Sequence, residues 1–288
     1  MFKNKIHSVL FLLPSLTLFC TATIYPLLYS FKLSFYSYNM LLPNSEPLYI
    51  GLRNYERLFS NSAFISSIGI TLTFVLISVF FEFFLGFALA LFITSKIKGV
   101  GWIRTSILLP LMMPPVVAGV LWRTIYHYKY GPLNYFMNQV GLQSQAWIGD
   151  PKQSLLSVIF VEIWQQTPIV IFILAAGIQS LPTEIFKAAK IDGAKPFKIL
   201  FELTLPLLKP VIIVVLLIRI MDAFRIFDVI YTLTFGGPGR TTEVMSLLIY
   251  KTGLQFFQIG KASAMSWMFL SFILIISFFL IKQLQNKK

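Results

Sequence analysis

About six apolar runs recur along the chain, and each is long enough to cross a membrane as a helix. They cover residues 9–33, 65–94, 105–126, 154–179, 211–235 and 262–282. A helix needs roughly 20 apolar residues to cross the hydrocarbon core of a bilayer. Hydrophobic residues make up 57% of the chain and charged residues only 12%, about half the charged share of soluble domains. The sequence therefore predicts an all-α integral membrane protein with about six transmembrane helices, in a single transmembrane domain over residues 1–288.

The charge distribution predicts how this chain is oriented in the membrane. The formal net charge is +13, and the lysines and arginines are scattered among the loops. Short loops rich in Lys and Arg stay in the cytoplasm, so the pattern favours membrane topology over binding to nucleic acid. The basic loop Ser95–Arg104 and the basic chain ends predict cytoplasmic termini. Cys20 stands alone, and His7 and His127 are far apart, so neither a disulfide framework nor a metal site is predicted.

The longest charged interval is residues 181–210, between the fourth and fifth apolar runs. It carries five lysines and three acidic residues, which predicts a cytoplasmic loop. Pro182 suits the first turn of a helix that Ser180 or Thr183 can cap, and Gly193 suits a left-handed turn that ends it. Small and apolar residues share one face of this helix: Ile185, Phe186, Ala188 and Ala189. We expect a short helix that another protein can approach closely, followed by turns bounded by proline.

This interval resembles the cytoplasmic coupling loop of the permease subunits of binding-protein-dependent ABC importers. The family pattern is a Glu-Ala-Ala triplet, then a glycine, then Ile-x-Leu-Pro at fixed spacings. In this chain it reads Lys187, Ala188, Ala189, then Gly193, then Leu203, Leu205 and Pro206. The sequence Ile-Asp-Gly-Ala, which ends at Ala194, is typical of sugar permeases. Lys187 reverses the charge of the family glutamate, and Glu184, one turn earlier, can partly substitute for it.

The resemblance extends over most of the chain. Segments similar to the family are Gly51–Phe64, Leu108–Asn134, Phe227–Tyr250 and Gly260–Trp267. Within Phe227–Tyr250, the Phe-Asp pair and the later Gly-Gly-Pro resemble the first permease of maltose- and glycerol-phosphate-type importers. The fold that the resemblance implies is that of type I ABC importer permeases. The ATPase-coupling residues that it implies are Glu184, Ile185, Lys187, Ala188, Ala189, Asp192 and Gly193.

The function that the resemblance implies is ATP-driven import of a sugar, a di- or oligosaccharide or a related polyol, across the inner membrane of a bacterial cell. The implied partners are a second homologous permease, two ATPase subunits, an extracytoplasmic solute-binding protein, the sugar and membrane lipid. The chain has no GxxxxGK[ST] loop to hold ATP phosphates. We therefore expect ATP to be bound by the partner ATPase, and we expect no catalytic residue, metal or cofactor in this chain.

Polar residues inside the fourth and fifth apolar runs are candidates for the substrate path. They are Glu162, Trp164, Gln165, Gln166, Asp222, Arg225 and Asp228. Hydroxyl-rich ligands need amide and carboxylate partners and aromatic faces, and the resemblance implies substrate contacts in the spans that flank the coupling loop. A structural interpretation stays open, because Arg219, Asp222, Arg225 and Asp228 alternate in sign at helical spacing and can neutralise each other. Glu82 in the second run has the same two interpretations, a functional carboxylate or a hydrogen-bonded structural one.

Three alternatives remain from the sequence. The first is an ABC permease for glycerol phosphate or another solute, such as an amino acid or a peptide. The second, less favoured, is a proton-coupled secondary transporter in which Glu82, Glu162 or Asp222 relays protons. The third is a membrane-embedded enzyme, for which the sequence offers no legible pair of nucleophile and base. The Ile-Asp-Gly-Ala and Gly-Gly-Pro forms favour a sugar.

Overall fold

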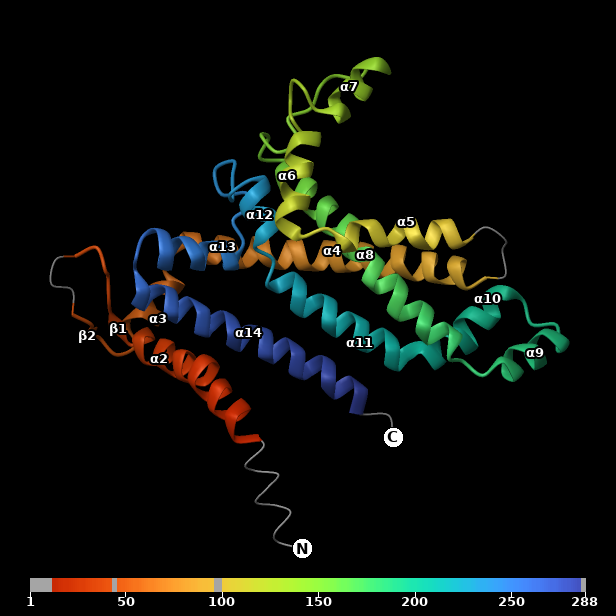
Figure 1. Ribbon diagram of the computed structural model, residues 1–288, viewed down its shortest axis with the longest axis horizontal. Coiled ribbons are helices and arrows are strands. Elements are labelled where there is room, and N and C mark those ends of the chain that lie inside the picture. Colours follow the sequence, from red (N-terminus) through yellow and green to blue (C-terminus); the bar gives the residue numbers. More distant parts are fainter. Residues whose placement is uncertain (1–11, 43–45, 96–99, 286–288) are drawn as a thin grey trace, which may run out of the picture. The chain divides into compact units, whose positions relative to one another are not determined.

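The computed structural model describes residues 12–42, 46–95 and 100–285, and this part of the chain is mostly helical (Figure 1). Five of its helices are long and apolar enough to cross a membrane: Leu12–Ser34, Ser62–Thr94, Ser154–Gln179, Pro196–Leu233 and Ile259–Phe279. A bent pair, Thr105–Met112 with Pro115–Ile125, raises this to six if it forms one span. The predicted all-α membrane fold is confirmed. The basic leader, residues 96–99 of the basic loop 95–104 and the last residues lie outside the described residues.

The helical elements follow the chain in the order shown in Figure 1. The first span contains a π-helical stretch, η1 (Cys20–Ile24), and α2 (Tyr25–Ser34). After a small hairpin come α3 (Arg53–Phe59), α4 (Ser62–Thr94), α5 (Val100–Met112), α6 (Pro115–Ile125), α7 (Pro132–Gln139) and α8 (Ser154–Gln179). The rest are α9 (Thr183–Ile191), α10 (Pro196–Lys198), η2 (Ile199–Thr204), α11 (Leu205–Phe224), α12 (Asp228–Leu233), α13 (Met245–Tyr250), η3 (Lys251–Gln255) and α14 (Ile259–Gln285).

The third predicted span is two helices, with a bend of 101° between α5 and α6. The break lies at Pro114, which has an extended backbone with ψ of 138°. A residue that precedes proline is disfavoured in the helical region, and Pro114 precedes Pro115. Pro110, by contrast, lies inside α5 without ending it. The proline pair therefore breaks the helix where a single proline does not.

The fifth span begins earlier than the sequence suggested. Residues 196–210 were expected to be loop with proline-bounded turns, but they form α10, η2 and the start of α11. Pro206 lies in the first turn of α11, directly after the π-helical η2, and local π-helical turns are one way in which membrane helices accommodate proline. Pro210 lies inside the same helix, and membrane helices tolerate interior proline. At its other end, α11 stops at Phe224 and α12 resumes at Asp228.

The chain divides into two compact units, whose boundaries fall inside α4, α13 and α14. The first unit comprises residues 1–65 and 248–272. Its two-stranded antiparallel hairpin pairs β1 (Tyr36–Ser37) with β2 (Leu48–Tyr49). The buried amide of Asn54 on α3 donates to the backbone oxygens of Ser34 and Tyr36, at 2.8 and 2.9 Å. This amide therefore fixes the end of α2 to the start of the hairpin.

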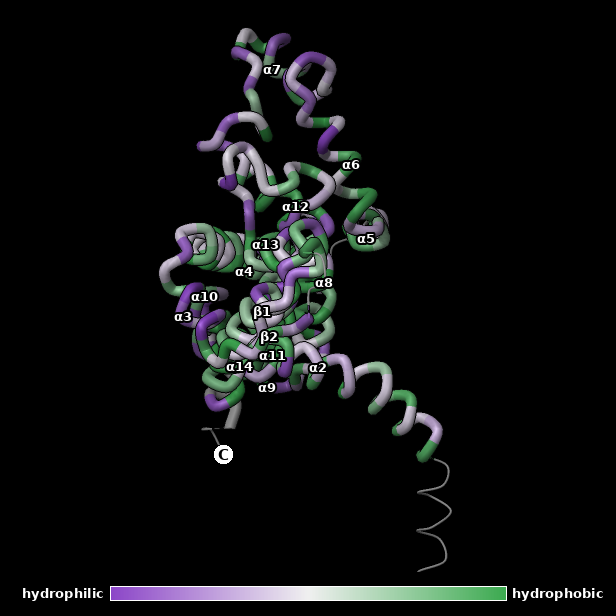
Figure 2. The backbone as a smooth tube through the Cα atoms, turned by 90° about the vertical axis from the view of Figure 1, so that its left-hand side faces the viewer, coloured by the Kyte–Doolittle hydropathy of each residue, from purple (hydrophilic) through white to green (hydrophobic). Residues whose placement is uncertain are grey.

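The second unit comprises residues 66–247 and 273–288, and it contains the candidate site. Its core brings together apolar residues of α4, α8 and α11: Ala90, Ile93, Val170, Ile171, Leu174, Ala175 and Val215. The backbone of α4 approaches α8 closely at Gly86, where an added Cβ would lie 2.6 Å from Cγ1 of Val170. Figure 2 shows α4 mainly hydrophobic, whereas hydrophilic residues gather around α7. Close packing of α4, α8 and α11 places their few polar side chains next to one another.

Candidate functional site

A buried ion cluster joins the three packed helices of the second unit. Arg219 on α11 is 2% exposed, and its guanidinium lies between Glu82 on α4 and Glu162 on α8. Nε donates to Oε2 of Glu82 at 2.8 Å, and Nη2 donates to Oε1 of Glu82 at 3.2 Å. Nη2 also donates to Oε1 of Glu162 at 2.9 Å. One cation therefore neutralises carboxylates from two other helices at a site where all three side chains are buried.

The cluster continues towards a more exposed pair at the end of α11. Asp222 lies 3.7 Å from Nη1 of Arg219, and its Oδ1 accepts a 2.6 Å hydrogen bond from Nη2 of Arg225. The side chain of Asp222 is 39% exposed and that of Arg225 is 70% exposed. Asp228 begins α12 after the helix break and makes no ion pair within the described residues. The polar groups thus pass from fully buried at Arg219 to accessible at Arg225.

This geometry bears on both interpretations of the intramembrane charges. The predicted pairing along the helix is present from Arg219 to Arg225, but Asp228 is not part of it. The sequence did not show that Arg219 binds Glu82 and Glu162, because spacing along one helix says nothing about neighbouring helices. One signal was available, since charges inside membrane spans generally find partners there. Arg219 was missing from the candidate residues, and it is the centre of the cluster.

The glutamines of α8 have different surroundings. Gln165 is 2% exposed, and its Nε2 donates to the backbone oxygen of Met113 at 2.8 Å. Met113 lies in the break between α5 and α6, so this amide satisfies a carbonyl that the bend leaves without a helical donor. Gln166 is half-buried. Trp164, also half-buried, packs against Trp122 of α6 with ring centres 5.4 Å apart. Gln165 thus holds the bend, while Trp164 and Gln166 keep accessible surface.

The predicted docking helix is α9, and the structure shows how it ends. Gly193 has φ of +74°, a conformation that side-chain-bearing residues rarely adopt. The N–H of Gly193 donates to the oxygen of Lys190 at 3.1 Å, and the N–H of Ala194 donates to that of Ala189 at 2.9 Å. These two hydrogen bonds form a Schellman motif. At the other end Pro182 precedes the helix without a side-chain cap, so the expected cap by Ser180 or Thr183 is wrong.

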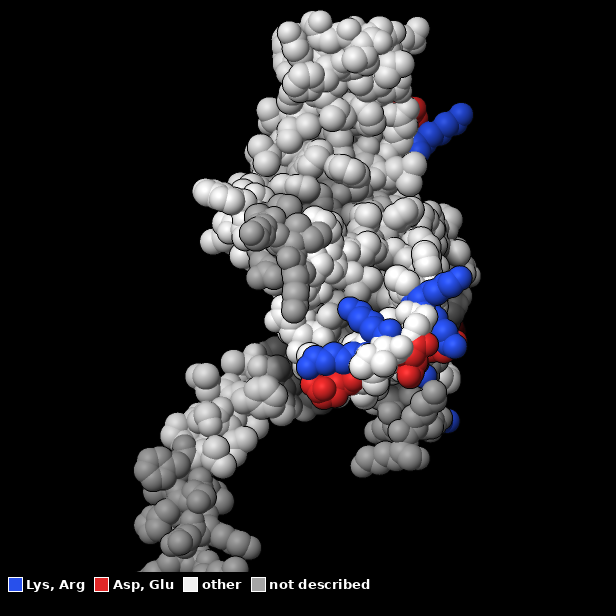
Figure 3. All heavy atoms as spheres, turned by 90° about the vertical axis from the view of Figure 1, so that its right-hand side faces the viewer, with Lys and Arg blue, Asp and Glu red and all other residues white. Residues whose placement is uncertain are grey.

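The helix α9 buries none of its residues within the chain. Ile185 and Ile191 of α9 are 42% and 86% exposed, and Phe197 of α10 is 77% exposed. Figure 3 shows Lys and Arg next to Asp and Glu over the α9–α10 region. In this region Nζ of Lys187 lies 2.9 Å from Oε1 of Glu184. Glu184 therefore pairs with Lys187 within α9, and its role in place of the family glutamate stays a prediction.

A hollow of about 460 Å³ lies beside α9. Its lining residues are Ala189, Asp192, Gly193, Ala194, Lys195, Lys198, Ile199, Glu202 and Leu203. The small residues at the end of α9 form one wall, and α10 with η2 forms the other. The structure thus combines an exposed helix, exposed apolar side chains and a concave surface in one loop region. Such a combination suits a docked protein better than bulk water.

Comparison with known proteins gives a matching family model, a similar relative and similar solved structures. The family model described as "binding-protein-dependent transport system inner membrane component" matches residues 83–287. The chain is 37% identical over 270 residues to the trehalose/maltose transport system permease protein MalF of Thermococcus litoralis, which covers 93% of this chain and 90% of that protein.

Two solved structures are also similar. One is a bacterial ABC transporter involved in import of the acidic polysaccharide alginate, with a TM-score of 0.87 and 25% identity over 99% of this chain and 97% of that chain. The other is the bacterial alginate ABC transporter in complex with a periplasmic protein that holds an alginate pentasaccharide. Its TM-score is 0.83 and its identity is 26%, over 96% of this chain and 93% of that chain.

Proposed function

Because the chain belongs to the binding-protein-dependent transport system inner membrane components, we propose that α9 couples its membrane spans to a separate ATPase. The protein is a multi-pass membrane permease subunit of an ABC sugar importer. Its homologues work with a solute-binding protein. The full assembly that we propose adds a second homologous permease and two ATPase subunits. ATP is bound by those ATPase subunits, and this chain contributes no catalytic residue.

The observation that carries the coupling proposal is the exposed α9 with its adjoining hollow. The helix buries nothing in its own chain, and its Schellman end holds Ala189 and Gly193 at the edge of the concave surface. In this proposal closure of the ATPase subunits moves α9, and α11 transmits the motion because α10 and η2 join the two helices without a long loop. The spans then open outward, and the binding protein releases sugar into them.

The substrate path that we propose follows the accessible polar residues of α8, α11 and α12. Asp222 on α11 and Arg225 just after it are exposed enough to meet a ligand. Gln166 lies on α8, and Asp228 begins α12, the next helix along the chain. Trp164 offers an aromatic face. Glu162 and Gln165 are already bonded inside the protein, so they support this path rather than line it. By analogy with the relative from Thermococcus litoralis, trehalose and maltose are the first substrates to try.

The orientation that we propose places both termini and α9 in the cytoplasm. Short basic loops stay on that side, and the interval that contains α9 is rich in lysine. A cysteine at exposed position Lys187 should therefore react with a membrane-impermeant thiol reagent only after the cells are opened.

The test of coupling is co-purification of the tagged permease from membranes, followed by detection of bound ATPase. An Ala189→Asp variant introduces a charge at the small-residue edge of the hollow. Ala63→Asp is the matched control, because Ala63 is also half-buried but begins α4, where a negative charge suits the helix dipole. We expect Ala189→Asp to lose the ATPase and Ala63→Asp to retain it. Equal retention by both variants would refute docking at α9.

A further inference from the structure

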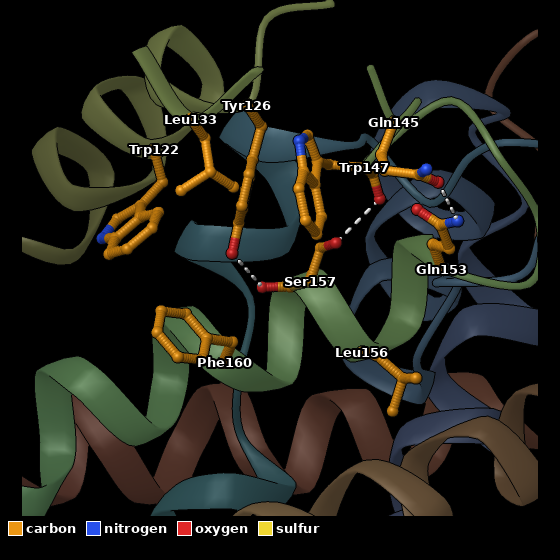
Figure 4. Close-up of a pocket in the computed structure, with 9 residues that line it drawn as sticks. All are labelled: Trp122, Tyr126, Leu133, Gln145, Trp147, Gln153, Leu156, Ser157 and Phe160. Atoms are coloured by element: carbon orange, nitrogen blue, oxygen red, sulfur yellow. Dashed lines mark hydrogen bonds between the residues drawn. The ribbon is translucent and has the colours of Figure 1, made fainter. Parts of the chain in front are cut away.

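A second cavity lies at the opposite end of α8 from the coupling loop. Its volume is about 550 Å³, within the range of about 300–1,000 Å³ that is usual for ligand pockets. Four aromatic rings line it, together with two leucines, two glutamines and a serine: Trp122, Tyr126, Trp147, Phe160, Leu133, Leu156, Gln145, Gln153 and Ser157 (Figure 4). They come from α6, α7, the loop after α7 and the first turns of α8.

Aromatic contacts lead from this cavity into the span. Tyr126 stacks on Trp147 with ring centres 5.9 Å apart and an angle of 28°. Trp122 then lies 5.2 Å from Tyr126 and 5.4 Å from Trp164. Trp164 is next to Gln165 and Gln166 in α8. A series of rings thus runs from the loop before α8 to the polar part of that helix.

The polar groups of the cavity leave one acceptor unused. Nε2 of Gln153 donates to Oε1 of Gln145 at 2.9 Å, and Oγ of Ser157 donates to the backbone oxygen of Trp147 at 2.7 Å. Oε1 of Gln153 is buried and accepts no hydrogen bond in the described structure. In Figure 4 this oxygen points towards Trp147 and Ser157. A buried acceptor without a donor is costly, and after a rotation of the Gln153 amide towards the cavity that it lines, a bound hydroxyl group would satisfy this oxygen.

We propose that this cavity is an outer subsite that binds one ring of the transported sugar before the sugar reaches Trp164. This inference rests on the proposed function. The C–H faces of a pyranose pack on aromatic rings, and its hydroxyl groups donate to amide oxygens. A lipid acyl chain would also fill an apolar cavity, but it would leave Oε1 of Gln153 without a donor. The aromatic lining and the unused acceptor together favour the sugar.

The first test measures whether sugar protects a thiol placed in the cavity. Phe160 is 52% exposed, so Phe160→Cys should fold. Cys20 is exposed and is replaced by serine. Phe136→Cys on α7 is the matched control, since Phe136 is 67% exposed and does not line the cavity. The complete importer in lipid nanodiscs, with its binding protein, is treated with a polar maleimide, with and without trehalose or maltose. At about ten times the Kd, sugar should slow labelling at position 160 roughly tenfold and leave position 136 unchanged.

A second test fills the cavity. Leu156 is 58% exposed, so Leu156→Trp places a larger side chain in the cavity and reduces its free volume without disturbing a buried core. It should lower sugar uptake severalfold at saturating sugar, whereas Phe136→Trp should not. The subsite is overturned if the wild-type importer takes up trehalose or maltose but sugar does not change the labelling rate at position 160. That outcome leaves the proposed function intact. A second outcome would also overturn the subsite. If position 160 is protected from the maleimide in nanodiscs but labelled in a zwitterionic detergent, and sugar changes neither result, the cavity is occupied by lipid. Absence of sugar uptake by the wild-type importer would instead overturn the proposed function.

Discussion

Replacing Arg219 with methionine removes the one cation from the buried ion cluster. Three hydrogen bonds to Glu82 and Glu162 disappear, and both carboxylates are left in a site where they are no more than 5% exposed. Breaking a buried ion pair by removing one partner costs about 3–5 kcal/mol, chiefly because the remaining charge has no compensation. For a chain of this size, each kcal/mol lost from the free energy of unfolding lowers the melting temperature by about 2–4 °C. We therefore expect the melting temperature to fall by about 6–20 °C.

The assay is thermal unfolding of the purified permease in detergent, followed by tryptophan fluorescence. Arg225→Met is the matched control, because Arg225 also pairs with an acid but its side chain is 70% exposed, and exposed pairs contribute little. A triple variant, Arg219→Met with Glu82→Gln and Glu162→Gln, removes the charges together and should recover most of the loss. The reasoning is refuted if Arg219→Met and Arg225→Met melt alike, or if the triple variant is no more stable than Arg219→Met.

Three further perturbations follow from the packing and the turns. Gly86→Val should cost about 1–3 kcal/mol by overpacking, seen as a lower melting temperature, because even a Cβ there meets Val170 at 2.6 Å; unchanged melting would mean that α4 and α8 are not this close. Gln165→Leu should cost about 1–3 kcal/mol in the same assay, since the oxygen of Met113 loses its donor at the α5–α6 bend. Gly193→Val should weaken ATPase co-purification without loss of the folded permease, because φ of +74° strains a β-branched residue at the end of α9; full retention would show that this turn does not position the docking surface.

Local sequence signals predicted the helices well where their cause is local. The long apolar runs require spanning helices, and Gly193 after a short helical stretch predicted the turn that ends α9. The three prolines of the third apolar run, Pro110, Pro114 and Pro115, favour a broken helix there, but their positions alone indicate neither that Pro110 stays inside α5 nor that the bend is 101°. That angle depends on partners from elsewhere in the chain, such as the amide of Gln165, which satisfies the oxygen of Met113.

The ion cluster and the outer cavity depend on contacts between segments far apart in the sequence. The spacing of Arg219 and Asp222 revealed their pairing, because both lie on one helix. Glu82 is separated from Arg219 by two other spans in the chain, so no periodicity connects them. The cavity likewise needs Trp122 from α6 and Trp147 from the loop before α8 to line one space, although α7 lies between them in the chain. Taken alone in the sequence, each of these two tryptophans is interpreted simply as an interfacial or buried aromatic residue.

The most direct test of the central account is uptake of radiolabelled trehalose and maltose by proteoliposomes. They contain the complete importer with this chain as permease, ATP on the α9 side and the binding protein on the other side. The account predicts that sugar uptake requires ATP, is unchanged by a protonophore and is lost in the Ala189→Asp variant of α9. Uptake that a protonophore abolishes and that proceeds without ATP would contradict it, and would favour proton coupling through carboxylates such as Asp222.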